Sequence, residues 1–193
     1  MYYPRSAYNG NPHAGVDVNS DNGWGGYQWP GGVPRELLAE SRSGDVAITA
    51  RRELTELFGC LVQICEQKHG YKVHGDQTWS YENRPIAGTQ TPSNHSRGRA
   101  VDINAPQNPY SSTWQCDMPP AMVADLESLG FYWGGRYVDQ PTDPMHYEYW
   151  QPPCDVAASV ARARSILAGV ITTDWLDAVC YTDFIAAAKE ALR

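Results

Sequence analysis

Apolar residues recur at helical spacing between residues 47 and 69. The apolar stripe consists of Ile48, Leu54, Leu57, Phe58, Leu61, Val62 and Ile64. Residues three and four positions apart share one face of an α-helix, and glycine is common just past a helix end. The pattern therefore predicts one main helix over residues 47–69, followed by Gly70.

Two later runs alternate between apolar and polar residues. In RAVDIN (99–104), Val101 and Ile103 point to one side of an extended chain and Asp102 points to the other. The run MHYEYW (145–150) follows the same two-residue period. We expect both runs to be short strands, each with one accessible face that carries polar side chains.

Turn residues delimit the remaining elements. Residues 120–129 form a predicted helix with proline in its first turn and Gly130 behind it. Residues 131–138 indicate a third strand, interrupted by a Gly-Gly pair, and two further helices are expected at about 155–168 and 174–192. Strands and helices in this order predict an α+β fold.

The 193 residues suffice for one domain with short extensions. Residues 1–34 are rich in Gly, Asn and Pro and predict an irregular N-terminal arm. Residues 35–153 hold the strands and the main helix, and residues 154–193 form a C-terminal helical extension packed on or next to that domain. Three aromatic residues are expected to pin the arm: Trp24, Tyr27 and Trp29.

The chain is acidic, with a net charge of -7 and a pI of about 5.1. Proteins that bind nucleic acid usually present a basic patch, so the charge disfavours nucleic acid as a partner and a nuclease as the function. The longest apolar runs fall short of the ~20 residues that cross a membrane. The first ten residues lack the apolar core of a signal peptide. We therefore expect synthesis without a signal peptide and no membrane insertion.

The five cysteines do not form a metal-binding pattern, because no C-x-x-C occurs. Cys60 and Cys65 fall in the apolar helical run and are expected to be buried thiols. Cys116 and Cys154 flank the polar segments, and the sequence leaves open whether they form a disulfide.

Two polar stretches offer groups that bind metals. The segment 93–104 contains His95 and Asp102, and the segment 143–149 contains His146 with Glu148 on the same strand face. Zinc accepts His nitrogen and carboxylate oxygen, and a catalytic zinc keeps one position open for water. Spacing alone favours two interpretations equally. The histidines bind a metal, or they are structural residues that form hydrogen bonds with their neighbours.

The motifs in these stretches resemble those of the D-alanyl-D-alanine carboxypeptidase family of zinc peptidases. The pattern Ser-x-His-x-x-Gly-x-Ala-x-Asp is matched by Ser93, His95, Gly98, Ala100 and Asp102, and acid-x-x-His by Asp143 and His146. The family includes vancomycin-resistance D,D-dipeptidases and phage L-alanyl-D-glutamate peptidase endolysins. The likeness covers about residues 45–150, and residues 83–110 look most like the phage or actinobacterial endolysin branch.

The resemblance implies a small antiparallel sheet, packed against helices, that carries one zinc ion. His95, Asp102 and His146 are the implied ligands. Asp143 stands where the family has its catalytic base, although many relatives have glutamate there, and Glu148 is its rival because it shares a strand face with His146. Pro144 favours an extended conformation at residue 143.

The family also uses an arginine to grip the substrate or the oxyanion, and Arg84 is the best match. Its alternative role is a surface arginine paired with Glu82. Ser93 is expected to position the loop or a substrate group. Arg97 and Arg99 occupy unspecified motif positions and are expected to face solvent.

The implied function is a peptidoglycan hydrolase of the endolysin type that cleaves a peptide bond in stem peptides or cross-links. It would be made in the host cytoplasm and act on the cell wall after release, or from a virion. The alternative is a non-catalytic wall-binding or structural module with the same fold. Four aromatic residues are expected to be core rather than groove walls: Tyr132, Trp133, Tyr147 and Trp150.

Overall fold

The computed structural model of this protein describes residues 1–8, 10–86, 88–138 and 141–169. The strands are β1 (Leu38–Ser43), β2 (Val46–Arg51), β3 (Ala100–Asp102), β4 (Phe131–Trp133) and β5 (His146–Tyr149). The α-helices are α1 (Thr55–Gln63), α2 (Pro120–Ser128) and α3 (Val156–Leu167), and a π-helical turn, η4 (Ile64–Lys68), extends α1. The 3-10 turns are η1 (Arg5–Ala7), η2 (Arg35–Leu37), η3 (Arg52–Leu54), η5 (Gly75–Gln77), η6 (Gly134–Arg136) and η7 (Pro153–Asp155). The helix expected at 174–192 lies outside the described residues.

The strands form two antiparallel sheets. β1 and β2 make a hairpin, and a three-stranded sheet has the order β3-β5-β4. The extended segment 79–81 lies between the sheets: the Tyr81 amide donates to the Thr49 carbonyl of β2 at 3.2 Å, and Trp79 and Asp102 exchange two backbone hydrogen bonds of 2.9 and 2.7 Å. The predicted α+β architecture with a small antiparallel sheet is confirmed.

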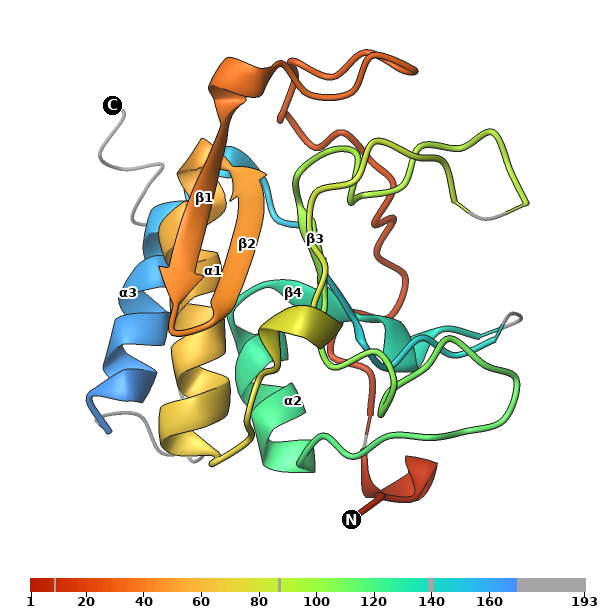
Figure 1. Ribbon diagram of the computed structural model, residues 1–193, viewed down its shortest axis with the longest axis vertical. Coiled ribbons are helices and arrows are strands. Elements are labelled where there is room, and N and C mark those ends of the chain that lie inside the picture. Colours follow the sequence, from red (N-terminus) through yellow and green to blue (C-terminus); the bar gives the residue numbers. More distant parts are fainter. Residues whose placement is uncertain (9, 87, 139–140, 170–193) are drawn as a thin grey trace, which may run out of the picture.

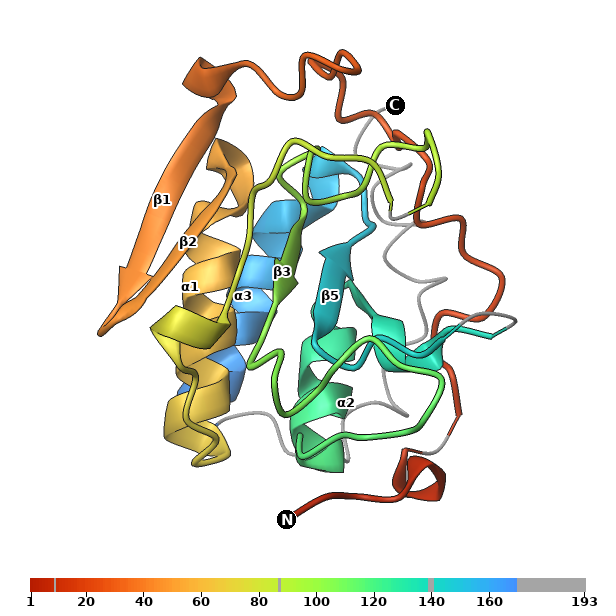
Figure 2. The ribbon, with the colours of Figure 1, turned by 45° about the vertical axis from the view of Figure 1, so that its right-hand side comes forward.

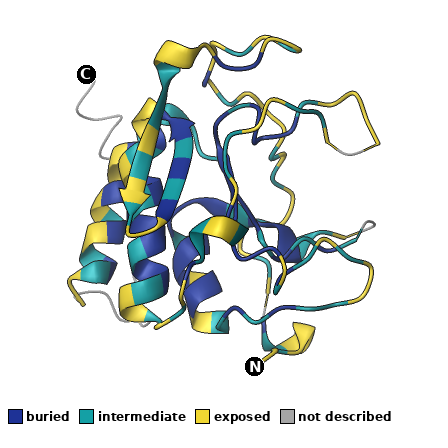
Figure 3. Ribbon diagram, viewed as in Figure 1, coloured by how far each residue is buried: buried dark blue, intermediate teal, exposed yellow. Residues whose placement is uncertain are grey.

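The helices gather on one side of the sheets (Figure 1). α1 packs against β1, β2 and α3, while α2 packs against β4. Phe58 of α1 meets Phe131 of β4 edge to face, with ring centroids 5.4 Å apart. The burial pattern in Figure 3 follows this layering, with exposed outer faces on β1 and α3. None of the described helices has the length and apolar character needed to cross a membrane.

The prediction of a helix over residues 47–69 is wrong at its start. Residues 46–51 form β2, in which Val46, Ile48 and Ala50 are buried, and α1 begins only at Thr55. Ile48 fits both a two-residue and a 3.6-residue period, so the apolar stripe alone did not separate the strand from the helix. The predicted end holds, because Gly70 follows the last helical turn with a φ of 61°.

The N-terminal arm contains the 3-10 turn η1 and otherwise extended or turn residues, and it is anchored. Trp24 is buried and donates from its indole nitrogen to the Gln151 carbonyl at 2.9 Å. The Tyr27 hydroxyl lies 3.3 Å from Ser96 Oγ. Figure 2 shows the arm on the side of β3 and β5 that faces away from α1 and α3.

The cysteines that the structure describes are all free thiols. Cys60 and Cys65 are buried in the helical region, as expected. Cys116 is buried and accepts a hydrogen bond from the Tyr8 hydroxyl at 3.2 Å, whereas Cys154 is exposed. The disulfide that the sequence left open is therefore not formed.

Candidate metal centre

The register of the sheet brings two predicted ligands together. Asp102 of β3 lies directly opposite His146 of β5. Side chains of directly opposed residues project from the same face of a sheet. Asp102 Oδ1 consequently lies 2.9 Å from His146 Nδ1. Val101 and Ile103 are buried in the hydrophobic core, as the alternation predicts.

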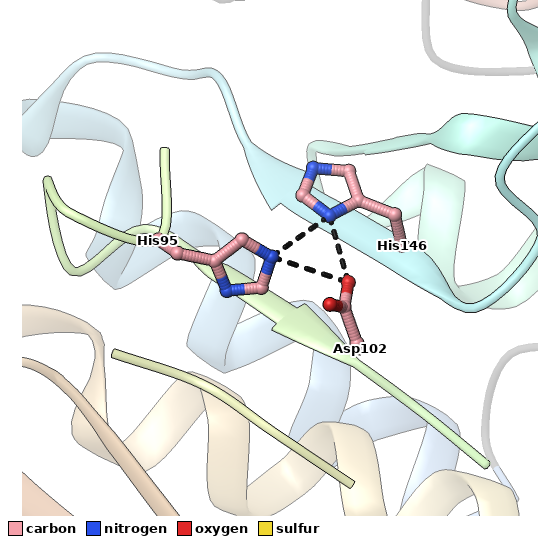
Figure 4. Close-up of side chains that lie close together, drawn as sticks. All are labelled: His95, Asp102 and His146. Atoms are coloured by element: carbon pink, nitrogen blue, oxygen red, sulfur yellow. Dashed lines mark hydrogen bonds and ion pairs between the residues drawn. The ribbon is translucent and has the colours of Figure 1, made fainter. Parts of the chain in front are cut away.

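His95 reaches the same point from the loop before β3. Its Nε2 lies 3.2 Å from Asp102 Oδ1 and 3.1 Å from His146 Nδ1 (Figure 4). The Ser93 hydroxyl accepts a hydrogen bond from the His95 amide at 3.3 Å. Gly98, at a φ of 66°, closes the loop against β2, where a Cβ atom would lie 3.0 Å from the Arg51 nitrogen. A side chain at position 98 would therefore push the loop away from the sheet.

The spacing of the three atoms fits a tetrahedral zinc ion. The pairwise distances among His95 Nε2, Asp102 Oδ1 and His146 Nδ1 are 2.9–3.2 Å. Zinc bonds of 2.0–2.1 Å at tetrahedral angles separate neighbouring ligand atoms by roughly 3.3 Å. All three residues are buried, and they are the group of potential metal ligands found among the described residues.

Hydrogen bonds at the far side of each imidazole fix which nitrogen faces the cluster. His95 Nδ1 lies 2.6 Å from the Ser80 carbonyl, so it carries the proton and leaves the Nε2 lone pair free. His146 Nε2 lies 3.2 Å from Glu148 Oε2, so its Nδ1 lone pair points inward. When both imidazoles are neutral, two lone pairs and a carboxylate oxygen converge on one point, an arrangement that a cation satisfies.

The acidity of Asp102 reflects this arrangement. Burial by itself raises the pKa of a carboxyl group. In the metal-free protein, in which the imidazoles can carry protons, the charges and hydrogen bonds of His95 and His146 outweigh burial and hold the pKa of Asp102 well below its usual value. Asp102 therefore offers an ionised oxygen to a cation.

Asp143 lies beside the cluster, and one of its carboxylate oxygens forms no hydrogen bond with the described residues. Its Oδ1 is buried and has no hydrogen-bond partner among the described residues. Burial raises the pKa of the Asp143 carboxyl to about 6; the charge of His146 lowers it in part. The His146 amide donates to the Asp143 carbonyl at 3.0 Å, and the Asp143 amide donates to the Gly134 carbonyl at 3.1 Å. The backbone thus ties this carboxylate to the ligand His146.

Glu148, its rival, accepts hydrogen bonds at both carboxylate oxygens. Its Oε2 accepts from Asn94 Nδ2 at 2.7 Å and pairs with His146 Nε2, and its Oε1 accepts from the Tyr137 hydroxyl at 2.8 Å. Burial would raise the pKa of Glu148, but the charge of His146 and these hydrogen bonds outweigh it and lower the pKa. Glu148 lies on the His146 face of β5, as predicted, and it orients the imidazole.

The other predicted site residues lie further out. The Arg84 guanidinium forms an ion pair with Glu82 at 2.8 Å on the surface, and the Arg84 carbonyl accepts from the Ser93 amide at 3.2 Å. Ser93 is buried and bonds within the loop. The expectation that Arg99 faces solvent is wrong: its side chain is buried, because Asn94 and backbone carbonyls of the N-terminal arm accept its hydrogen bonds.

Sequence reasoning missed several groups that surround the ligands. Asn94 and Tyr137 hold Glu148, and the Ser80 carbonyl fixes the His95 tautomer. Asn94 lies within the motif at an unspecified position, so only the buried carboxylate next to it reveals its role. Every residue has a backbone carbonyl, so the sequence does not indicate the role of the Ser80 carbonyl.

The aromatic residues considered as groove walls divide into two groups. Trp133 and Tyr147 are fully buried in the core, as favoured. Tyr132 is half-buried and stacks on Tyr137 with ring centroids 5.9 Å apart, and Trp150 is half-buried against His13. The prediction that these residues belong to the core is confirmed only for Trp133 and Tyr147.

Comparison with known families agrees with this centre. Residues 87–149 match the family model for D-alanyl-D-alanine carboxypeptidase. This segment contains the three clustered residues and Asp143, and the match supports a metallopeptidase related to peptidoglycan cleavage. Peptidases of this family depend on zinc, in line with the donor set found here. No curated protein and no solved structure matches the chain.

Proposed function

We propose that this protein is a zinc-dependent peptidase that hydrolyses a peptide bond in the stem peptides or cross-links of bacterial peptidoglycan. One observation carries the proposal: three potential ligand atoms lie 2.9–3.2 Å apart beside a carboxylate oxygen that has no hydrogen-bond partner in the described part of the chain. A cation site supplies an activated water, and a neighbouring free base can take the proton of that water, so the two together suit metal-assisted hydrolysis. It lies within the segment that matches the family model.

His95, Asp102 and His146 would hold one zinc ion. When bound, zinc supplies an acidified water and polarises the carbonyl of the substrate. Asp143 is the general base: its unpartnered oxygen takes the proton of the attacking water and then delivers it to the leaving amine. The raised pKa of Asp143, at about 6, suits a group that must both accept and release a proton near neutral pH.

The hydrogen bonds of Glu148 support Asp143 in this assignment. Both Glu148 oxygens already accept hydrogen bonds from His146, Asn94 or Tyr137, and these contacts stabilise the ionised carboxylate and disfavour the uptake of a proton. A carboxylate used in that way orients a ligand and is a poor shuttle for protons. Motif position and geometry thus favour the same residue.

Two residues are proposed to contact the substrate, and a third to position the loop of His95. Trp79 is 52% exposed and lies opposite Asp102, which itself lies opposite His146. The three side chains form one row on one face, so the exposed indole borders the metal centre. Arg84 would release its ion pair with Glu82 and bind a substrate carboxylate or the oxyanion instead. Ser93 would hold the loop that carries His95.

We also propose that the protein acts as an endolysin. The resemblance of residues 83–110 to the phage and actinobacterial branch supports this role. It implies synthesis in the host cytoplasm and action on the wall after release, or from a virion.

Digestion of purified peptidoglycan tests the proposal. Mass spectrometry of the products should reveal one new type of amino and carboxyl terminus, and EDTA should abolish its appearance. A non-catalytic wall-binding module would instead sediment with peptidoglycan and release no new termini, and that result would end the proposal.

A further inference from the structure

A line of buried polar side chains runs outward from His146. Glu148 Oε2 lies 3.2 Å from His146 Nε2 and accepts from Asn94 Nδ2 at 2.7 Å. Asn94 Oδ1 in turn accepts from Arg99 Nη2 at 2.9 Å. All four residues are at most 6% exposed. Each contact is therefore shielded from competing water.

Asn94 is the link whose orientation is fully determined. A carboxamide has one oxygen that accepts and a nitrogen with two hydrogens to donate. The oxygen faces Arg99, while the nitrogen donates to Glu148 and, at 2.8 Å, to the Val18 carbonyl. A flipped amide would place its oxygen against the carboxylate of Glu148, so the two neighbours lock a single orientation.

The line ends on the N-terminal arm. Arg99 donates to the carbonyls of Ser20 and Asp21 at 3.0 and 3.4 Å. The planar guanidinium holds these acceptors and the Asn94 oxygen in one rigid fork. We call residues 18–21 the arm segment; it lies outside the residues that match the family model.

Arg97 provides an internal comparison. Its guanidinium also donates to the arm segment, at the Asn19 carbonyl at 2.8 Å, and it lies 5.3 Å from the ring of Tyr27. Unlike Arg99, it binds the arm without bonding to the Asn94 side chain. Both arginines attach the arm, but only Arg99 also supports the Asn94 side chain. Variants of the two arginines can therefore distinguish these two roles.

We infer that Arg99 and Asn94 are positioning residues of the metal centre, anchored by the arm segment. They hold the carboxylate of Glu148, and Glu148 holds the His146 imidazole with Nδ1 directed at the cluster. The inference rests on the proposed zinc centre. Loss of an outer hydrogen-bond partner typically weakens metal binding by about 10- to 100-fold.

The test is the zinc Kd of the full chain, measured by competition with a chromophoric chelator. Arg99→Met should raise the zinc Kd by about 10- to 100-fold, and Asn94→Asp should do the same, because a carboxylate would then face Glu148. The matched control Arg97→Met should keep the wild-type Kd. Cobalt-substituted protein should show an altered visible spectrum in the first two variants only.

The outcomes are separable. An Arg99→Met variant with wild-type zinc Kd and cobalt spectrum overturns the inference, and so does an equal loss in Arg97→Met, which would assign the effect to arm docking as a whole. Far-UV circular dichroism of the metal-free variants checks folding. If Arg99→Met does not fold, the zinc Kd of Asn94→Asp decides the test. A wild-type chain without zinc affinity would overturn the proposed function together with this inference, whereas tight wild-type binding with unaffected variants overturns the inference alone.

Discussion

Gly134 lies against Asp143. The Asp143 amide donates to the Gly134 carbonyl at 3.1 Å, and a Cβ atom on residue 134 would collide with the Asp143 carbonyl oxygen and lie 3.1 Å from the His146 Cβ. Glycine therefore lets η6 approach both the proposed base and a proposed ligand.

Gly134→Ala should displace Asp143 and His146 together. Overpacking of this kind costs about 1–3 kcal/mol, so we expect a lower free energy of unfolding in urea and a weaker zinc affinity. Gly59→Ala, within α1, is the control, because among the described residues its Cβ would meet only the flexible Ser41 hydroxyl at 2.8 Å. Equal behaviour of the two variants would refute the crowding argument.

Asp143→Asn should stabilise the metal-free protein at pH 7. The folded-state pKa of Asp143, about 6, exceeds the ordinary value of 3.8, so ionisation of this group reduces stability as pH rises through 6. Asparagine removes that charge, and we expect a gain of about 1–3 kcal/mol at pH 7 that vanishes near pH 4. Urea unfolding in EDTA at both pH values measures it; an unchanged free energy at pH 7 would contradict the raised pKa.

The two candidate bases should differ in activity and metal affinity. Asp143→Asn should lower kcat by about 10²- to 10⁴-fold, the usual contribution of a general base, with zinc still bound. Glu148→Gln should mainly raise the zinc Kd, because the amide no longer accepts from His146 in the same way. Steady-state kinetics and zinc titration of both variants decide the assignment. The reverse pattern would make Glu148 the base.

Metal removal should destabilise the fold. Without a cation, only imidazole protons bridge the closely spaced acceptor atoms of His95, Asp102 and His146, whereas zinc at 100 times its Kd would add about 2.7 kcal/mol. We expect EDTA to lower the Tm, and Asp102→Ala to abolish the zinc-dependent shift. His74→Gln, outside the cluster, should keep the shift, and an Asp102→Ala variant that also keeps it would speak against the site.

Trp79→Ala should weaken substrate binding without unfolding the protein. Loss of a contact worth about 1–2 kcal/mol corresponds to roughly a 5- to 30-fold lower kcat/KM. We expect a higher KM and an unchanged kcat. Tyr2→Ala removes an aromatic side chain of similar exposure, 58% against 52%, from the N-terminus and serves as the control. Kinetics on peptidoglycan fragments compare the two; an unchanged KM for Trp79→Ala would remove it from the substrate site.

Local patterns were sufficient for the elements with a single periodicity. The alternation around Asp102 and His146 predicted β3 and β5, and proline and glycine delimited α2. Periodicity failed at Ile48, which fits two periods, because only pairing with β1 distinguishes the strand. Arg99 occupies an unspecified motif position, for which the sequence predicts solvent exposure, and the acceptors that bury it come from the arm, 78 and 79 residues away in sequence.

The sequence by itself determined the chemistry that this protein has to offer: two imidazoles and carboxylates in two short motifs, on strands whose alternation fixes the face of each side chain. Only the tertiary structure decided how those groups combine. The β3–β5 register set Asp102 opposite His146, and the Ser80 carbonyl and Glu148 selected the inward-facing nitrogens. Hydrogen bonds from Asn94 and Tyr137 engage Glu148, whereas Asp143 keeps an oxygen without a partner among the described residues. The reason is that residue type and period are local properties, whereas register, tautomer and burial depend on contacts between distant segments.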